Sequence, residues 1–372
     1  MRAVKVLHMA DMHLEWPFAG LGIDARRGRM RREELKEVFA SIVDLAIREQ
    51  VQLFLIAGDL FEHDHLTRAT VLWLEQQFRR MEGIRVFISP GNHDPLLPNS
   101  YYRSFPWPEN VHIFGPEPER VDLDPLGVSV YGWGFPAYEV TSWQLGSLRV
   151  ADPRRINIVL LHGGDERYHP FRPSELSALE ADYIALGHIH KAGVVWEEDG
   201  RVIAQYPGSP EALSFGEPGL HGVLVGTVGK EVNRLMPVVT GKRQFISRAV
   251  NVTGAATPEE LVQAVLAVDG EFERMTHAYR LALTGTVDPE LTIDLPLLEE
   301  RLAPHFYLLR LQDQTRRDYD LAGLARERSA RGLFVQRLLA MEAQAADPQE
   351  RARLQRALQL GLAAFQERGG AR

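Results

Sequence analysis

The stretch VKVLHMADMH, residues 4–13, places two polar side chains directly after a short apolar run. Val4 to Met9 is typical of a buried β-strand, and Asp11 and His13 follow its carboxyl end. The same arrangement recurs after four later predicted strands, at Gly58-Asp59, Gly91-Asn92-His93-Asp94, His162-Gly163 and Gly187-His188-Ile189-His190. Open α/β sheets place ligands at the carboxyl ends of their strands, so these blocks predict one shared site.

The segments around these blocks alternate between apolar runs and amphipathic stretches, which is typical of an α/β sheet. Periodicity predicts helices over 31–49 and 67–81, and strands over 53–57, 85–89, 129–133, 156–161 and 183–186. From Val194 to Val239, short strands with Gly and Pro turns predict a second sheet. We therefore expect a four-layer αββα sandwich over residues 1–244.

A small α+β module is predicted over 245–313, with strands over 278–283 and 306–311 around a helix over 295–302. Its first helix begins at Thr257, which can act as N-cap to Pro258 and Glu260. The polar, weakly periodic segment 314–331 is interpreted as a linker. Residues 332–372 are expected to form a helical tail with apolar stripes made by Leu338, Met341, Leu354, Leu358, Leu362 and Phe365.

The composition excludes several kinds of chemistry. None of the 372 residues is cysteine, so thiolate zinc sites, disulfides and cysteine nucleophiles are ruled out. The first ten residues favour neither a signal peptide nor a membrane span, and we expect a cytoplasmic protein without membrane contact. The net charge of −8 does not indicate a nucleic-acid binder, but bound divalent ions would add positive charge where phosphate must lie.

The residue types in the five blocks favour a two-metal hydrolytic site. Asp, Asn and His without thiolates suit Mn²⁺, Fe²⁺ or Zn²⁺. Asp59 is the natural bridge, because two carboxylate oxygens can hold two ions about 3.5–4 Å apart. A single pair such as His188 and His190 would more often be surface or packed histidines, but five ordered blocks are hard to explain in that way.

On these blocks the chain resembles the calcineurin-like metallophosphoesterases, and within them the SbcD-type nucleases of DNA double-strand-break repair. The opening HMADMHLEWPFAGL, residues 8–21, is most similar to the YhaO-like bacterial branch, and the resemblance covers roughly residues 1–310. It implies a Mn²⁺-dependent DNA exonuclease or endonuclease with two ions, one held by Asp11, His13, Asp59 and His190, and the other by Asp59, Asn92, His162 and His188. His93 would act on the leaving sugar oxygen, and Asp94 would accept its second ring N–H.

One departure from the family pattern is Glu62, which stands where archaeal and eukaryotic relatives usually have histidine and bacterial relatives often have an acid. His63 and His65 are expected to be exposed and to bind no metal. Two clusters keep two interpretations each. Arginines could grip phosphate or begin a solvated helix, and aromatic residues could stack on a base or pack a loop; these are Arg26, Arg27, Arg29, Arg31 and Arg32, and Tyr101, Tyr102, Phe105 and Trp107. Tyr206-Pro207-Gly208-Ser209-Pro210 is predicted to turn near the site.

Other functions remain as alternatives. A phosphatase or small-phosphodiester hydrolase of the same superfamily is disfavoured, because the Asp-Arg-Gly continuation of protein phosphatases is missing after Gly58-Asp59. A metal-free scaffold is disfavoured, because every ligand position holds a competent residue. The resemblance implies DNA and an SMC-like coiled-coil ATPase of the SbcC type as partners, the latter through the tail, and leaves a homodimer open.

Overall fold

Two six-stranded sheets form the core of the first of two compact units, Met1–Phe245 and Ile246–Arg372. The computed structural model describes residues 3–146 and 148–369, with the backbone alone for 366–369. The first sheet has the order β12-β11-β1-β2-β3-β4, and its strands are β1 (Ala3–Met9), β2 (Leu53–Ile56), β3 (Arg85–Ile88), β4 (Val111–Ile113), β11 (Gly222–Gly229) and β12 (Arg234–Val239). Strands β1 to β4 are parallel, while β11 runs antiparallel to β1.

The second sheet has the order β5-β6-β7-β8-β10-β9. Its strands are β5 (Glu119–Leu123), β6 (Val128–Gly132), β7 (Ile156–His162), β8 (Tyr183–Gly187), β9 (Gly193–Glu198) and β10 (Arg201–Tyr206). Strands β6, β7, β8 and β10 are mutually parallel along the sheet. The carboxyl ends of the parallel strands of each sheet therefore meet at one edge, where the polar blocks follow them.

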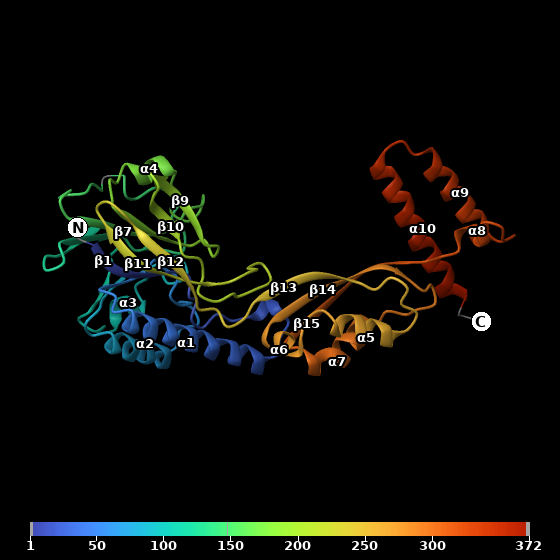
Figure 1. Ribbon diagram of the computed structural model, residues 1–372, viewed down its shortest axis with the longest axis horizontal. Helices are drawn as coiled ribbons and strands as arrows, with labels where there is room; N and C mark the ends of the chain where they lie inside the picture. Colours follow the sequence, from blue (N-terminus) through green and yellow to red (C-terminus); the bar gives the residue numbers. More distant parts are fainter. Residues whose placement is uncertain (1–2, 147, 370–372) are drawn as a thin grey trace. The chain divides into compact units, whose positions relative to one another are not determined.

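The apolar side chains of β1 alternate between two cores. Leu7 and Met9 pack with the helices on the outer face, while Val4 and Val6 pack between the two sheets. This alternation follows from the two-residue period of a strand buried on both faces. Helices α1 (Ala25–Arg48) and α2 (Arg68–Arg80) cover the outer face of the first sheet, side by side in Figure 1.

The predicted αββα sandwich is confirmed, with two differences in detail. The fourth layer is thin, because only the short α4 (Pro173–Ser177) and neighbouring loops cover the second sheet. Strands β11 and β12, which we expected in the second sheet, instead extend the first sheet beside β1. Short apolar strands carry no local signal for the sheet they join, because tertiary packing decides it. The unit also contains η1 (Ala19–Leu21) and α3 (Tyr101–Ser104).

The second unit contains a three-stranded sheet of order β13-β14-β15 and a helical tail. Strands β13 (Phe245–Asn251), β14 (Ala278–Val287) and β15 (Leu308–Arg317) pack against α5 (Pro258–Leu266) and α7 (Leu295–Leu302), with α6 (Glu271–Thr276) and η2 (Ala303–His305) between them in sequence. Thr257 caps α5 as predicted, with Glu260 closing the capping box.

The segment 314–331, which we interpret as a linker, carries secondary structure. Strand β15 continues to Arg317 because its polar end stays paired with β14, and α8 (Leu321–Leu324) and the start of α9 (Ala330–Gln344) occupy the rest. Helix α10 (Pro348–Gly369) packs on α9, where Leu358 and Leu362 are buried against Val335. Within the described residues, no helix is long and apolar enough to cross a membrane.

Candidate metal centre

The loops that carry the polar blocks have an unusual backbone. Four of the predicted ligand residues have positive φ, namely Asp11 (55°), His13 (48°), Asp59 (51°) and His188 (105°). Non-glycine residues rarely adopt this region, and such strain is concentrated at functional sites. The strained loops are tied together, because the Asp11 and His13 backbone N–H groups donate to the carbonyls of Gly58 and Asp59, at 3.0 Å each.

Glycine is required where these loops come closest. A Cβ on Gly58 would lie 2.3 Å from Nδ1 of His162, and one on Gly187 would lie 1.8 Å from the carbonyl oxygen of Ala57. The glycines in the sequence blocks therefore allow the two sheets to bring their loops together, which a side chain at either position would prevent.

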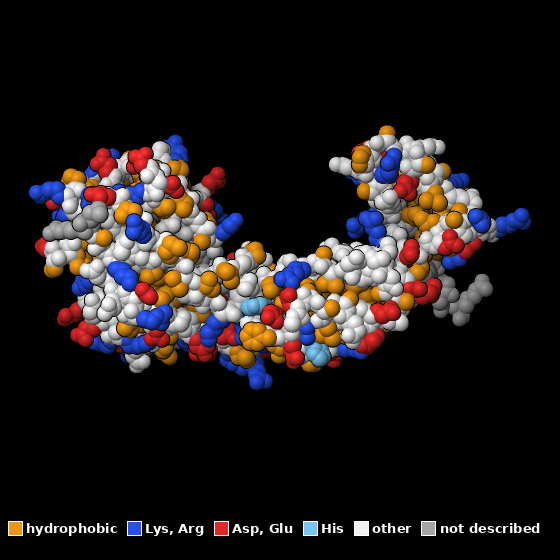
Figure 2. Space-filling model, viewed as in Figure 1, with side chains coloured by type: hydrophobic (Ala, Val, Ile, Leu, Met, Phe, Trp, Pro, Cys, Tyr) orange, Lys and Arg blue, Asp and Glu red, His pale blue; other side chains and the backbone are white. Residues whose placement is uncertain are grey.

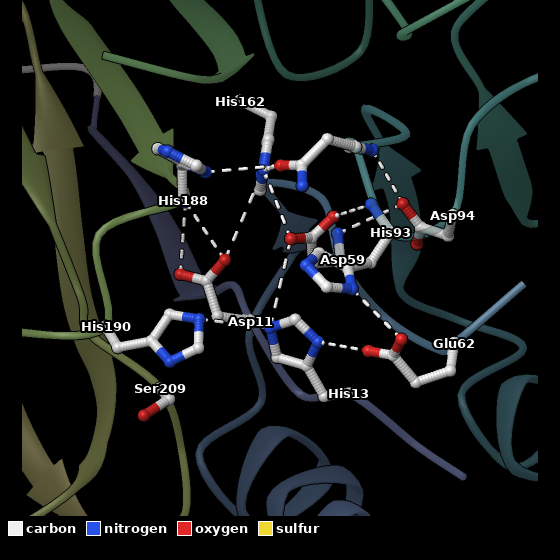
Figure 3. Close-up of polar contacts among 12 residues, drawn as sticks. Asp11, His13, Asp59, Glu62, His93, Asp94, His162, His188, His190 and Ser209 are labelled. Carbon is white, nitrogen blue, oxygen red and sulfur yellow. Dashed lines mark hydrogen bonds and ion pairs between the residues drawn. The ribbon is translucent and has the colours of Figure 1, made fainter. Parts of the chain in front are cut away.

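The ligand atoms form two adjoining groups (Figure 3). In the first, ligand atoms of Asp11, His13 and His190 all lie within 4.8 Å of one another, and the Nε2 atoms of His13 and His190 are 3.0 Å apart. Two imidazole nitrogens bound to one ion at about 2.1 Å and at a right angle are separated by about 3 Å. The distance between these facing nitrogens therefore fits a cation shared by the two rings.

Asp59, His162 and His188 make the second group within the same limit. Nε2 of His162 lies 3.3 Å from Oδ2 of Asp59, and that same oxygen lies 3.8 Å from Nε2 of His13 in the first group. Asn92 joins the second group through Oδ1, which is 2.9 Å from His162 and 3.2 Å from His188. The structure thus brings all the predicted ligands together, with Asp59 between the two groups.

The second ring nitrogen of each of these histidines has an acceptor. His13 donates from Nδ1 to Glu62 at 2.6 Å, His162 from Nδ1 to the Ala57 carbonyl at 2.8 Å and His190 from Nδ1 to Glu217 at 2.9 Å. His188 is reversed, since its Nε2 donates to Asp165 at 2.8 Å. Carboxylates and carbonyls only accept, so they fix the tautomer and leave the other nitrogen free for a metal ion.

The charges of the centre also favour cations. Burial opposes the charged form of His162, but the carboxylates of Asp59 and Asp11 outweigh it and raise its pKa to about 9. His190 behaves in the same way: burial is outweighed by Glu217 and Asp11, and its pKa rises to about 9. The carboxylates thus favour positive charge at the ligand histidines. Bound divalent ions would supply that positive charge in place of the ring protons. The donor set therefore fits two such ions.

His93 lies beside the ligand groups, and its predicted partner is wrong. Its Nδ1 donates to Oε2 of Glu62 at 2.9 Å, whereas we expected Asp94 to accept this proton. Burial lowers the pKa of His93, but Glu62 and Asp59 outweigh burial and raise it to about 9. A cavity of about 290 Å³ adjoins this ring, lined by Glu62, His63, Asp64, Asn92, His93, Tyr138, Glu139 and Tyr168.

Asp94 instead joins two ligand loops, in an arrangement that we call the Asp94 clasp. Its carboxylate accepts the backbone N–H groups of Gly91 (2.6 Å), Asp59 (3.1 Å) and Leu60 (2.7 Å), and the Tyr102 hydroxyl at 2.7 Å. Asp94 is fully buried, so these donors use both of its oxygens within the protein. The Asp94 side chain points away from the neighbouring His93 because the buried backbone N–H groups of these loops require an acceptor.

The aromatic cluster packs the loop. Trp107 is partly buried against the helices and donates from Nε1 to the Tyr101 carbonyl at 3.1 Å, and Phe105 contacts it with ring centroids 5.1 Å apart. The interpretation of stacking on a base is therefore not supported for Tyr102 and Trp107. The predicted turn at 206–210 lies near the site, where Gly208 (φ 77°) approaches the His190 carbonyl and Tyr206 donates to Gly163.

The arginine cluster divides into structural and exposed members. Arg31 is 1% exposed and forms ion pairs with Glu34 (2.6 Å) and Glu211 (3.0 Å), so it cannot grip phosphate. Arg26 and Arg29 are exposed on α1. On the face in Figure 2, basic and acidic side chains are interspersed over the first unit. His65 is exposed as predicted, whereas His63 is half-buried and lines the cavity beside His93.

Sequence reasoning missed the residues that orient the ligands. Glu217 and Asp165 lie in loops without periodicity, and neither stands at a fixed spacing from the histidine that it orients. Only Glu62 carried a signal, because it is an acid at a position where archaeal and eukaryotic relatives are expected to have a histidine.

Comparison with known proteins completes the description of the site. A family model described as calcineurin-like phosphoesterase matches residues 4–192. The chain is 33% identical over 354 residues to the uncharacterized metallophosphoesterase YhaO of Bacillus subtilis, an alignment that covers 86% of this chain and 83% of that protein. It is 28% identical over 224 residues to the DNA double-strand break repair protein Mre11 of Saccharolobus solfataricus, covering 56% of this chain and 55% of the relative. With the protein of the same name from Methanopyrus kandleri it shares 26% identity over 235 residues, covering 57% and 50%. The chain thus spans about half the length of these archaeal relatives.

Proposed function

Because this chain belongs to the calcineurin-like phosphoesterase family, we propose that it hydrolyses phosphodiester bonds in DNA with two divalent ions, in double-strand-break repair. The observation that carries this proposal is the pair of adjoining ligand groups with Asp59 between them and His93 beside them. The repair function named for the archaeal relatives favours DNA over a small phosphodiester. Mn²⁺ is the proposed ion, and Fe²⁺ or Zn²⁺ would suit the same donors.

We assign the first ion to Asp11, His13, Asp59 and His190, and the second to Asp59, Asn92, His162 and His188. Two such ions, when bound, neutralise phosphate oxygens and make water more acidic. The ligand histidines are held by acceptors at their second nitrogens, so they need little reorganisation on binding.

His93 is the proposed catalytic acid. Its side chain is 35% exposed, whereas that of the ligand His13 is 1% exposed, so His93 remains accessible to substrate. With Nδ1 committed to Glu62, Nε2 is the nitrogen that can donate a proton to the leaving sugar oxygen. The cavity of about 290 Å³ beside the ring gives the leaving nucleotide a place to lie.

The test is Mn²⁺-dependent digestion of end-labelled linear duplex, hairpin and single-stranded DNA, beside bis(4-nitrophenyl) phosphate. Cleavage of DNA at far higher kcat/KM than of the small ester is expected. His93→Ala should keep two ions per chain by elemental analysis but lose DNA cleavage by about 10²–10⁴-fold, the usual contribution of a general acid. Hydrolysis confined to the small ester would favour the small-phosphodiester alternative, and a metal-free wild-type protein would favour the scaffold.

An SMC-like ATPase is the proposed partner of the helical tail. The predicted stripes are partly used within the tail itself, since Leu358 and Leu362 are buried between α9 and α10. Met341 and Leu360 remain more than half exposed, at 53% and 62%. Met341→Lys with Leu360→Lys should therefore abolish co-purification with the ATPase while leaving metal content and melting temperature unchanged. Retained co-purification would place the partner elsewhere.

A further inference from the structure

Glu62 contacts two histidines that have different proposed roles. Its Oε1 accepts from Nδ1 of His13 at 2.6 Å, and its Oε2 accepts from Nδ1 of His93 at 2.9 Å. Figure 3 shows the carboxylate facing both rings, which meet edge to face with centroids 4.7 Å apart. The side chain of Glu62 is only 12% exposed, so water competes little for either oxygen.

The chemistry of these contacts sets both ring orientations. A carboxylate has two oxygens that only accept, so it can take an N–H from each ring at once. Each ring then presents Nε2 to the centre, His13 toward the first ligand group and His93 toward the substrate side. The backbone adds to this arrangement, because the Glu62 N–H donates to Leu14 at 2.9 Å and the His63 N–H donates to the His93 carbonyl at 2.9 Å.

We propose that Glu62 is a positioning residue that couples a metal ligand to the catalytic acid, by holding the Nδ1–H groups of His13 and His93 on its two oxygens. This inference rests on the proposed function. It goes beyond the ligand set, because one carboxylate fixes both where the first ion is held and which nitrogen reaches the leaving oxygen. A neutral imidazole at this position could not accept from both rings, since it has one acceptor nitrogen.

A competing interpretation is a third metal site, because His13, Glu62 and His93 also offer ligand atoms within 4.8 Å of one another. That site would use Nδ1 of both rings, so neither could carry a proton there. The two interpretations therefore differ in metal stoichiometry and in the protonated nitrogen.

The informative variant is Glu62→Gln, which keeps the length of the side chain but turns one acceptor into a donor. The amide oxygen can accept the N–H of one ring, but the amide NH₂ group faces the N–H of the other ring, and two donors cannot form a hydrogen bond. Glu217→Gln is the matched control, since Glu217 orients only His190 at 2.9 Å. Two substrates separate the roles: a dithymidine phosphate, whose sugar oxygen needs a proton to leave, and thymidine 5′-(4-nitrophenyl phosphate), whose phenolate leaves without one.

At saturating Mn²⁺, we expect Glu62→Gln to lose about 10–100-fold on the dinucleotide, as other orienting partners do, and less than about threefold on the nitrophenyl ester. Glu217→Gln should weaken Mn²⁺ binding in calorimetry. It should reduce the rates on both substrates equally when Mn²⁺ is limiting, and both rates should recover at high Mn²⁺. In the His93→Ala background, Glu62→Gln should add no further selectivity between the substrates, because its effect passes through His93.

Two measurements do not depend on turnover. Long-range ¹H–¹⁵N spectra of the metal-free protein should show a proton on Nδ1 of His93 in the wild type, and a loss or shift of this signal in Glu62→Gln. Metal analysis should give two ions per wild-type chain. Equal losses on both substrates in Glu62→Gln, or further selectivity when Glu62→Gln is added to His93→Ala, would overturn the proposal. An unprotonated Nδ1 of His93 or three bound ions per wild-type chain would overturn it as well. A wild-type protein that cleaves neither substrate would refute the proposed function, while the spectra would still test the geometry.

Discussion

Replacement of Tyr102 by phenylalanine would remove one bond of the Asp94 clasp and little else. The ring remains, and it packs 4.8 Å from the centroid of Phe61 and 6.2 Å from that of Trp107. Because the apolar burial stays, the difference in unfolding free energy reports on the hydroxyl that donates to Asp94 at 2.7 Å.

The magnitude follows from what Asp94 keeps. Hydrogen bonds to charged groups contribute about 1.5–3 kcal/mol, whereas leaving a buried charge without a partner costs about 3–5 kcal/mol. Asp94 retains three backbone N–H donors after the substitution, so the larger penalty does not arise. We therefore expect a loss of about 2 kcal/mol, which for a unit of this size lowers the melting temperature by about 4–8 °C.

The assay is thermal and urea unfolding of the metal-free protein, with Tyr101→Phe as the matched control. Tyr101 lies in the same short helix, and its contact with Trp107 uses the backbone carbonyl, which the control keeps. The control should stay within about 0.5 kcal/mol of the wild type. Calorimetry with Mn²⁺ should also show about tenfold weaker binding for Tyr102→Phe, because the clasp ties the Asp59 loop to the Asn92 loop.

Two results would refute this reasoning. A change in unfolding free energy within the range of the control would show that the clasp does not depend on the hydroxyl. The expected loss of unfolding free energy together with an unchanged Mn²⁺ affinity would show that the clasp stabilises the fold without positioning the ligands.

Three further predictions concern charge. Asp59→Asn keeps the shape of the side chain but leaves one acceptor oxygen and no charge, so elemental analysis should find fewer than two ions per chain; full loading would refute the bridging role. His8 is buried and its pKa is lowered from 6.5 to about 3, so its contribution to stability is complete above pH 6.5 and is lost as the pH falls toward 3; His8→Gln should flatten urea midpoints over this range. Replacing the arginines that form no buried ion pair should reduce the slope of log K against log salt by about 0.9 per lost phosphate contact, and an unchanged slope would return them to the solvated surface; these are Arg26, Arg27 and Arg29.

The layers of the sandwich and the gathering of the proposed metal ligands could be predicted because their signals are local. Strand β1 alternates between two cores, and each ligand block follows a strand within a few residues. The strand fixes where the loop begins, so a polar residue at its end has few places to point. Local patterns therefore carried both the fold class and the gathering of ligands from five separate loops.

Pairing over long distances in the chain could not be predicted in this way. Strand β11 joins β1 from more than 200 residues away in sequence, and nothing in its short apolar run distinguishes one sheet edge from the other. Arg31 lies in a run of arginines, but its side chain is buried and forms an ion pair with Glu211, a residue far along the chain. The local density of positive charge suggested phosphate binding, although this side chain forms buried ion pairs within the fold.

The exchange of partners between Asp94 and Glu62 has a physical reason that sequence proximity conceals. Asp94 follows His93 directly, but the turn that aims His93 at the centre leaves the N–H groups of Gly91 and Leu60 buried, and these take the adjacent carboxylate. His93 must then find an acceptor on another loop, and Glu62 is brought there because its backbone is paired with Leu14. The same pairing carries Glu62 to His13, so satisfying buried backbone donors in one loop determines which carboxylate orients both histidines.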